Sequence, residues 1–441
     1  MEYKEENMDI KEIEKTIDKI DTFSYYGKVS KIAGLTVESI GPITQIGEIC
    51  KILSLDKSIE VLAEVIGFKD NRIVLMPYGD LSGISSGSLV VSTKETLKVR
   101  INDSLRGRIL DGLGNPIDGR GAIESGEYYK VDNSPPNPLM RKRIKKILPL
   151  GIKAIDSLIT CGSGQRLGIF AGSGVGKSTT IGMIARNAKS DINIITLVGE
   201  RGREVNDFIE KDLKEEGLKK SVIIVATSDQ PALIRAKSAM VGTAIAEYFR
   251  DQGLEVLMLM DSVTRFAMAQ REIGMAMGEP PVSRGYTPSV FTVLPKLLER
   301  TGTSDKGCIT GLYTVLVEGD DLNEPITDSV RGILDGHIVL SRELANKNHY
   351  PAIDVLASIS RLMNDVCEPD HIEAANYIKN KLAVYKNAED LINIGAYKRG
   401  SNPEIDEAID IHKDIVSLLQ QKVDEVFAFD EIIDLLKSMR K

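Results

Sequence analysis

The chain has 441 residues, which allows two to four domains at about 150 residues each. Its composition, 42% hydrophobic and 27% charged, is that of a soluble globular protein and excludes a disordered or collagen-like chain. The formal net charge of −8 disfavours general nucleic-acid binding, and four widely separated cysteines indicate reduced thiols rather than a disulfide framework. Because neither a signal-peptide pattern nor a membrane-spanning apolar run occurs, we expect a cytoplasmic protein whose membrane association is peripheral.

The amino-terminal part predicts two different structures. Within residues 1–22, apolar residues recur at helical spacing in a charged segment: Met8, Ile10, Ile13, Ile17 and Ile20. This pattern predicts an amphipathic helix, which either packs on its own domain or docks a partner. Residues 23–98 contain short β-prone runs separated by turn residues, which predicts a small β-barrel.

The rest of the chain predicts two further domains. Residues 99–366 alternate apolar strands with helices, as in an α/β domain with a mainly parallel sheet. Residues 367–441 predict a helical domain, with helices at His371–Lys386, Glu404–Val426 and Asp430–Lys441. The fold class is therefore multidomain α/β. The basic segment Arg141–Lys146 is expected to be a solvated linker, with binding to anionic lipid or nucleic acid as the alternative.

A glycine-rich turn in the third domain predicts a phosphate-binding loop. An apolar strand, Leu167–Phe170, leads into the segment AGSGVGKST at 171–179, which opens an apolar helix. Glycines let backbone N–H groups face phosphate oxygens, and the helix N-terminus adds its positive dipole end. Lys177 is expected to reach the β- and γ-phosphates, and the Ser178 hydroxyl to coordinate Mg²⁺. The nucleotide-binding residues predicted here are Gly172, Ser173, Gly174, Val175, Gly176, Lys177, Ser178 and Thr179.

One position departs from the usual G-x-x-x-x-G-K-[ST] pattern, because Ala171 stands where the first glycine is expected. Alanine is a mild change there if its φ is negative.

Two other apolar strands end at carboxylates. The strand Leu254–Met260 leads to Asp261, which is placed to hold the magnesium ion, although an aspartate there can also cap the next helix. The strand Ile192–Val198 is followed by GERGRE at 199–204. Glu200 is the best candidate in it to orient or deprotonate water, unless this charged segment is only a solvated loop.

Together these segments resemble the rotary and export ATPases, the superfamily that contains the F1 catalytic subunit. The resemblance runs from about residue 25 to the end and rests on five segments: RGRILDGLGNPIDG at 106–119, GERGRE at 199–204, MDSVTRFAMAQRE at 260–272, GEPP at 278–281 and YPAIDVLASISR at 350–361. Within the superfamily, AGSGVGKS and the segments AQRE and GEPP are similar to those of flagellar protein export ATPases, where Ala171 is a usual residue.

The resemblance implies roles for individual residues. Glu200 matches the carboxylate that activates the attacking water, and Arg201 matches a residue of the same catalytic loop. Asp261 matches the acid that holds Mg²⁺ through water, and Arg265 an arginine near the γ-phosphate. Arg361 matches the arginine finger that acts on the nucleotide of the neighbouring subunit, a contribution of about 10³ to 10⁵ in rate where it has been measured.

The resemblance also implies the fold, the cofactors and the partners. It implies a β-barrel, a RecA-like core and a helical domain assembled as a hexameric ring, with Tyr350 stacked on the adenine of ATP. The helix within residues 1–22 would bind a stator-like regulatory protein, and the loop 278–286 would line the central pore. The implied function is Mg²⁺-dependent ATP hydrolysis that energises flagellar type III protein export, at the inner face of the cytoplasmic membrane. The export gate and the exported proteins or their chaperones would be further partners.

Four alternatives remain at this point. The ATPase of a virulence type III secretion system shares every motif quoted above. The F1 catalytic subunit is disfavoured because its acidic Asp-Glu-Leu-Ser-Glu-Glu-Asp segment is missing after Cys367. A Rho-like RNA translocase is disfavoured by the acidic, aromatic-poor composition. A noncatalytic ring subunit is disfavoured because Glu200 is present.

Overall fold

The computed structural model describes residues 25–440 apart from 318, 320 and 322. The amphipathic helix predicted within residues 1–22 lies outside these described residues. The chain divides into two compact units, one ending at Leu97 and the other running from Lys98 to Lys441. Across the described residues, no helix combines the length and the apolar character that crossing a bilayer requires.

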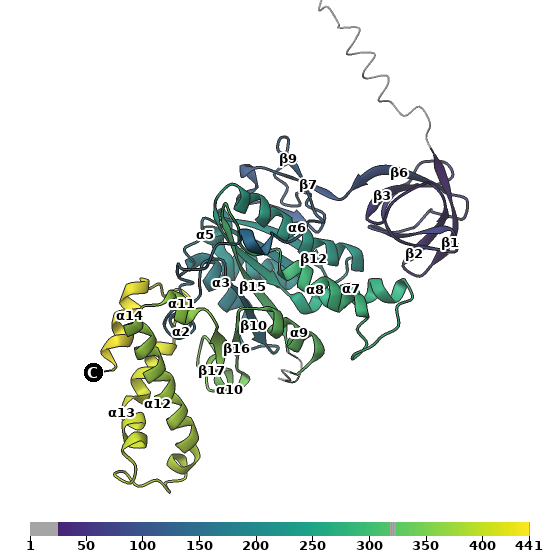
Figure 1. Cartoon of the computed structure of the whole chain (residues 1–441). Helices are drawn as coiled ribbons and strands as arrows, with labels where there is room; N and C mark the ends of the chain where they lie inside the picture. Colours follow the sequence, from purple (N-terminus) through teal and green to yellow (C-terminus); the bar gives the residue numbers. More distant parts are fainter. Residues whose placement is uncertain (1–24, 318, 320, 322, 441) are drawn as a thin grey trace, which may run out of the picture. The chain divides into compact units, whose positions relative to one another are not determined.

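The first unit is a closed β-barrel, which confirms the prediction for this part of the chain (Figure 1). Its strands follow the order β1-β2-β5-β4-β3-β6, and β1 pairs with both β2 and β6. Alternate residues point inward, so that aliphatic side chains such as Val37, Leu75 and Val90 fill the interior. The strands are β1 (Tyr26–Ala33), β2 (Thr36–Ile40), β3 (Glu48–Leu53), β4 (Glu60–Lys69), β5 (Arg72–Pro77) and β6 (Leu89–Thr96).

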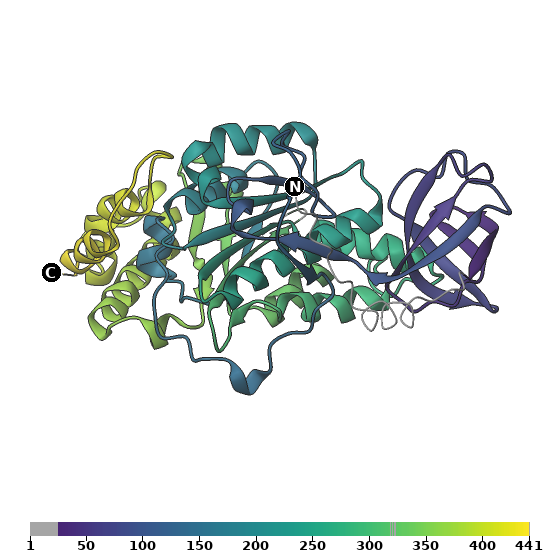
Figure 2. The ribbon, with the colours of Figure 1, turned by 90° about the horizontal axis from the view of Figure 1, so that it is seen from above.

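The second unit is built on a mainly parallel sheet with the order β17-β16-β10-β15-β13-β11-β12-β8. Along this order only the edge pair β16–β17 is antiparallel, and the short β14 also runs antiparallel to β15. Helices cover both faces (Figure 2), which explains why the central strands read as continuous apolar runs. The strands are β8 (Ile109–Asp111), β10 (Arg166–Ala171), β11 (Ile192–Glu200), β12 (Ser221–Thr227), β13 (Glu255–Asp261), β14 (Gly302–Thr303), β15 (Cys308–Leu316), β16 (Gly336–Leu340) and β17 (Ile353–Ser360).

Helices connect these strands, and a separate two-stranded ribbon joins β7 (Lys98–Ile101) to β9 (Glu127–Lys130). A π-helix, η3 (Phe208–Leu213), lies between α4 (Gly202–Asp207) and α5 (Lys214–Lys219). The other helices up to residue 366 are η1 (Asp103–Leu105), η2 (Pro138–Met140), α2 (Lys153–Leu158), α3 (Lys177–Asn187), α4 (Gly202–Asp207), α5 (Lys214–Lys219), α6 (Ala232–Asp251), α7 (Val263–Ala276), α8 (Pro288–Leu298), α9 (Pro325–Ile333), α10 (Arg342–Asn346) and α11 (Met363–Val366).

The chain ends in three helices, α12 (Pro369–Asn393), α13 (Pro403–Leu419) and α14 (Phe429–Ser438), of which the first two form an antiparallel hairpin (Figure 1). α13 stops at Leu419, before the predicted end at Val426. The periodic apolar pattern continues, but Gln420 adopts an extended backbone. The N–H of Gln421 then donates to the Tyr350 carbonyl at 3.0 Å instead of continuing the helix.

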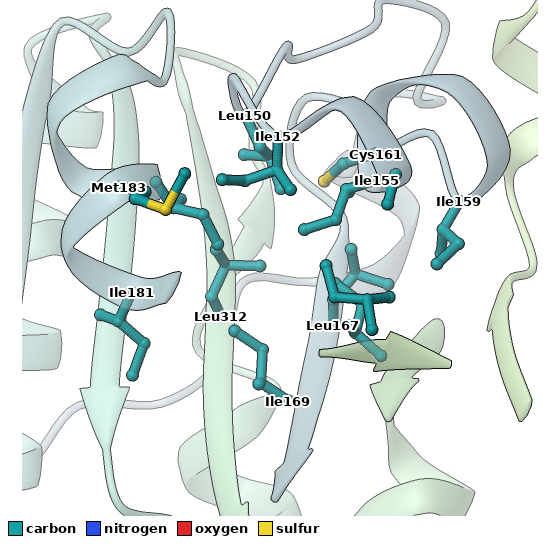
Figure 3. Packing of buried hydrophobic residues seen from close by; sticks show 14 of the residues in the cluster. Leu150, Ile152, Ile155, Ile159, Cys161, Leu167, Ile169, Ile181, Met183 and Leu312 are labelled. Atoms are coloured by element: carbon teal, nitrogen blue, oxygen red, sulfur yellow. The ribbon is translucent and has the colours of Figure 1, made fainter. Parts of the chain in front are cut away.

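One hydrophobic cluster contains side chains of both elements that flank the predicted phosphate loop, β10 and α3 (Figure 3). It combines side chains of β10, such as Ile169, with those of α3, such as Ile181, and with the segment before β10. The labelled members are Leu150, Ile152, Ile155, Ile159, Cys161, Leu167, Ile169, Ile181, Met183 and Leu312. Because β10 and α3 are both anchored in this core, the loop between them has a fixed start and a fixed end.

The basic segment 141–146 is tied to the core at both ends. Arg141 donates from Nη1 to the Thr301 carbonyl at 2.8 Å. Lys146 forms an ion pair with Glu255 at 2.7 Å. Lys142, Arg143 and Lys145 between these two attachments are exposed, and so is Lys146 itself.

Candidate active site

The glycine-rich loop connects β10 to α3 in the way that a phosphate cradle requires. β10 ends at Ala171 and α3 begins at Lys177. Gly174 and Gly176 have φ values of 78° and 88°, in the left-handed region that favours glycine. Val175 is buried and anchors the loop between them. The N-terminus of α3 and the free N–H groups of the loop therefore face the same space, where they can hold an anion.

Three side chains meet beside this loop, two from strand ends and one from the start of α3. Lys177 Nζ contacts Asp261 Oδ1 and lies 3.5 Å from Glu200 Oε1. Asp261 ends β13 and Glu200 ends β11, and these strands are parallel neighbours. Thr314 of β15 donates its hydroxyl to Asp261 Oδ1 at 2.7 Å, which holds that carboxylate toward the lysine. The sheet edge thus brings together one cation and two carboxylates.

Burial and close charges shift the pKa values of two groups in this cluster, Glu200 and Lys177. The side chains of Lys177, Glu200 and Asp261 are 13%, 14% and 8% exposed. Burial and the negative charge of Asp261 raise the pKa of Glu200 to about 7, although Lys177 partly opposes the change. Burial lowers the pKa of Lys177, but the two carboxylates outweigh burial and hold that pKa above its ordinary value. A carboxyl whose pKa lies near neutrality is suited to accept and release a proton.

Arg265 approaches the same cluster from α7. Ser262 caps this helix, since its hydroxyl accepts from the Arg265 N–H at 3.2 Å. A Cβ at Gly199 would stand 3.2 Å from Arg265 Cβ, so glycine permits the close approach of α7 to the end of β11. The guanidinium lies near enough to Glu200 to lower its pKa slightly. Its Nε is buried and has no hydrogen-bond partner among the residues that the structure describes.

A cavity of about 810 Å³ opens on the other side of the loop. Tyr350 lines it, and its ring lies 3.6 Å from where a Cβ of Gly176 would stand. Gly176 and Thr179 of the predicted loop also line it, but sequence reasoning missed most of the remaining wall. Lys153 and Asn348 contribute to it, and so does the stretch between α13 and α14, with the residues Gln420, Gln421, Lys422, Val423 and Glu425. No motif marks this stretch, which only the tertiary fold brings to the loop.

Two predicted residues do not join the cluster. The Arg201 side chain is 80% exposed and pairs with Glu204 of its own helical turn, at 3.5 Å. Arg361 follows β17, and its N–H donates to the Asp335 carbonyl, while the Asp335 N–H donates to the carbonyl of Arg166. Arg166 begins β10, whereas the phosphate loop follows the other end of that strand, about 16 Å away.

The remaining loop residues lie where the motif predicts. Ser173, Gly174 and Ser178 are exposed at the mouth of the loop, whereas Gly172 is buried. Thr179 hydrogen-bonds to the carboxylate of Asp212.

Comparison with known proteins identifies the family of this site. The model of the ATP synthase alpha/beta family, nucleotide-binding domain, matches residues 151–360, and that of its beta-barrel domain matches residues 29–94. The C-terminal domain of the EscN ATPase of type III secretion systems matches residues 367–438. The chain belongs to the flagellar and type III secretion ATPases of the ATP synthase alpha/beta family. It is therefore a nucleotide-binding ATPase.

Named relatives extend over nearly the whole chain. The flagellum-specific ATP synthase of Bacillus subtilis is 54% identical, over 96% of this chain and 97% of its own length. The type 3 secretion system ATPase of Xanthomonas euvesicatoria is 49% identical, over 94% of both chains. The assembled ATPase EscN of enteropathogenic E. coli superposes with a TM-score of 0.89 at 47% identity, covering 94% of this chain and 99% of its own. The predicted fold class is thereby confirmed.

Proposed function

We propose that this ATPase hydrolyses ATP with Mg²⁺ as an oligomeric ring and energises protein export through the flagellar type III apparatus. The observation that carries the chemistry is the cluster of Lys177, Glu200 and Asp261 beside the glycine-rich loop. The observation that favours the flagellar system is the 54% identity to a flagellum-specific relative. A virulence secretion system is the second candidate, because relatives from such systems reach 49% identity.

The donor set fits magnesium. Ser178 offers an exposed hydroxyl and Asp261 a carboxylate, which are oxygen ligands of the kind that Mg²⁺ takes up together with substrate phosphates. Among the described residues there is no preformed group of three or more acidic, His or Cys ligands, so most ligands would come from phosphate and water. When bound, the ion would neutralise charge on the β- and γ-phosphates.

The side chains have separate tasks in this proposal. Lys177 binds the β- and γ-phosphates, and Arg265 stabilises charge at the γ-phosphate. Glu200 orients the attacking water and accepts its proton, which its raised pKa favours. Tyr350 stacks on adenine in the adjoining cavity. Arg201 has no contact that assigns it a task in the isolated chain.

Arg361 acts in trans in this proposal, because β10 separates it from the phosphate loop of its own chain. Mixing two inactive variants tests this arrangement. Lys177→Ala protomers keep Arg361 but lose their own site, and Arg361→Ala protomers keep the site but lose the finger. We expect mixed rings to regain part of the hydrolysis that each variant lacks alone. Absence of any recovery, in mixed rings isolated through two different affinity tags on the two variants, would refute the assignment in trans.

A second experiment tests the biological role. We expect deletion of the gene to abolish filament formation and swimming, with rescue by the wild-type chain and no rescue by Lys177→Ala. Normal filaments after deletion would instead favour a virulence secretion system.

Further partners complete the proposal. The structures of EscN include one in complex with its central stalk EscO, which supports a ring with an axial partner. We assign residues 1–22 to a stator-like regulator, loop 278–286 to the pore, and the ring to the export gate and exported proteins or their chaperones, peripherally at the inner face of the cytoplasmic membrane. Removing residues 1–20 is expected to leave nucleotide hydrolysis intact and to abolish regulator binding in a pull-down. Retained binding would disprove that assignment.

A further inference from the structure

The stretch between α13 and α14 is fastened beside the nucleotide pocket by side chains that include Arg186 of α3, which donates to the Val423 carbonyl at 2.8 Å, and Gln421, which is 5% exposed. Its Oε1 accepts from the Lys153 N–H at 2.9 Å. Its Nε2 donates to the Gly151 carbonyl at 3.0 Å and to the Glu425 carbonyl at 2.8 Å. Its own backbone N–H donates to the Tyr350 carbonyl at 3.0 Å. The side-chain amide thus has both of its donor hydrogens and its acceptor in use.

Lys153 reinforces this attachment from the start of α2. Its Nζ donates to the Gln420 carbonyl at 3.1 Å and lies 4.1 Å from the centre of the Phe427 ring. Lys153 itself is only 8% exposed. Because α2 belongs to the cluster that also holds β10 and α3, the C-terminal stretch is tied to the same core that fixes the phosphate loop.

The residues that make these bonds line the cavity, so the bonds bear on how a ligand is held there. Tyr350, Lys153 and Gln421 all line the 810 Å³ cavity, and Tyr350 is 42% exposed, so its own ring is not held by burial. The Tyr350 carbonyl accepts from the backbone N–H of Gln421, and the side-chain bonds of Gln421 hold that backbone in place, so the side chain acts on Tyr350 through its own backbone. None of these hydrogen bonds of Gln421 and Lys153 is made to the phosphate loop, residues 172–176.

We propose that Gln421 is a positioning residue that holds Tyr350 and the C-terminal wall against the base-binding side of the nucleotide pocket. This inference rests on the proposed ATPase site and deepens it. Binding of the adenine end would depend on Gln421, whereas binding of the phosphate chain would not. The C-terminal helices would in this way set the affinity for nucleotide without touching the phosphates.

The test compares a nucleotide, ADP, with a ligand that consists of phosphates alone. Dissociation constants for ADP and for inorganic tripolyphosphate, which lacks the base, are measured by calorimetry on the full-length Gln421→Ala protein. We expect binding of ADP to weaken about tenfold, because loss of the three side-chain bonds loosens the wall whose backbone N–H holds the Tyr350 carbonyl, and binding of tripolyphosphate to change less than about twofold. Gln252→Ala is the matched control, since Gln252 is exposed at the end of α6, and should leave both constants unchanged.

A second variant guards against misfolding of the first. Gln421→Glu keeps an acceptor for the Lys153 N–H but loses both donor bonds, and we expect it to show the same selective loss of ADP. Equal weakening of both ligands in the two variants would mean a general collapse of the pocket and would overturn the proposal. Unchanged ADP binding would overturn it as well. Failure of the wild-type chain to bind either ligand would contradict the proposed function itself.

Discussion

The raised pKa of Glu200 predicts that a catalytically damaging substitution stabilises the nucleotide-free protein. The carboxyl has an ordinary pKa of 4.5 when unfolded and a pKa of about 7 in the fold. At low pH it is protonated in both states. As the pH rises through this interval the unfolded chain ionises first, so the fold loses about 3 kcal/mol of stability by pH 8. Glu200→Gln removes the ionisation and its cost, while leaving a neutral side chain of the same shape.

The assay is thermal unfolding of the nucleotide-free protein at pH 5 and pH 8, followed by circular dichroism. At pH 8 we expect Glu200→Gln to raise the Tm by about 4 °C for a unit of this size, and at pH 5 to change it little. Hydrolysis should fall by about 10² to 10⁴, because the amide cannot accept a proton. Glu216→Gln, at an exposed position, is the matched control. An equal Tm change at both pH values, or a loss of stability at pH 8, would refute the electrostatic reasoning.

Two further predictions concern packing in the second unit. A Cβ at Gly182 would stand within 2.8 Å of the Asp212 backbone, whereas one at Gly332 would meet nothing within 4 Å. In urea unfolding we expect Gly182→Ala to lower the free energy of unfolding by about 1–3 kcal/mol. Gly332→Ala, also in a helix, should not lower it. Equal effects of the two substitutions would contradict the close approach of α3 and η3. Arg300 and Glu247 form a buried two-bond ion pair at 2.8 and 2.9 Å. Arg300→Met should destabilise the protein by about 3–5 kcal/mol, because it leaves the buried charge of Glu247 unpaired. A urea midpoint within error of the wild-type value would contradict this prediction.

Much of the architecture is readable from local patterns. The barrel strands alternate with a period of two, and the core strands are continuous apolar runs, because each strand is buried on one face or on both. Glu200 and Asp261 were predicted as site residues because each follows an apolar strand, and a phosphate loop needs a carboxylate for magnesium and a group that orients water. The end of α13 was predicted too late, at Val426, since apolar periodicity does not register a hydrogen bond that pulls Gln421 toward Tyr350.

The amino-acid sequence by itself determined the phosphate loop, the strand-end carboxylates and the class of fold, since these depend on neighbours close along the chain. The tertiary structure alone decided which distant groups complete the site. Gln421 bonds to Lys153, a residue 268 positions away, and no local periodicity encodes such a contact. Likewise, only the place of the edge strand β17 in the sheet shows that Arg361 lies near the opposite end of β10 from its own phosphate loop. Contacts between distant segments depend on how the elements pack. That packing is set by the side chains of the whole core together, and no single motif determines it.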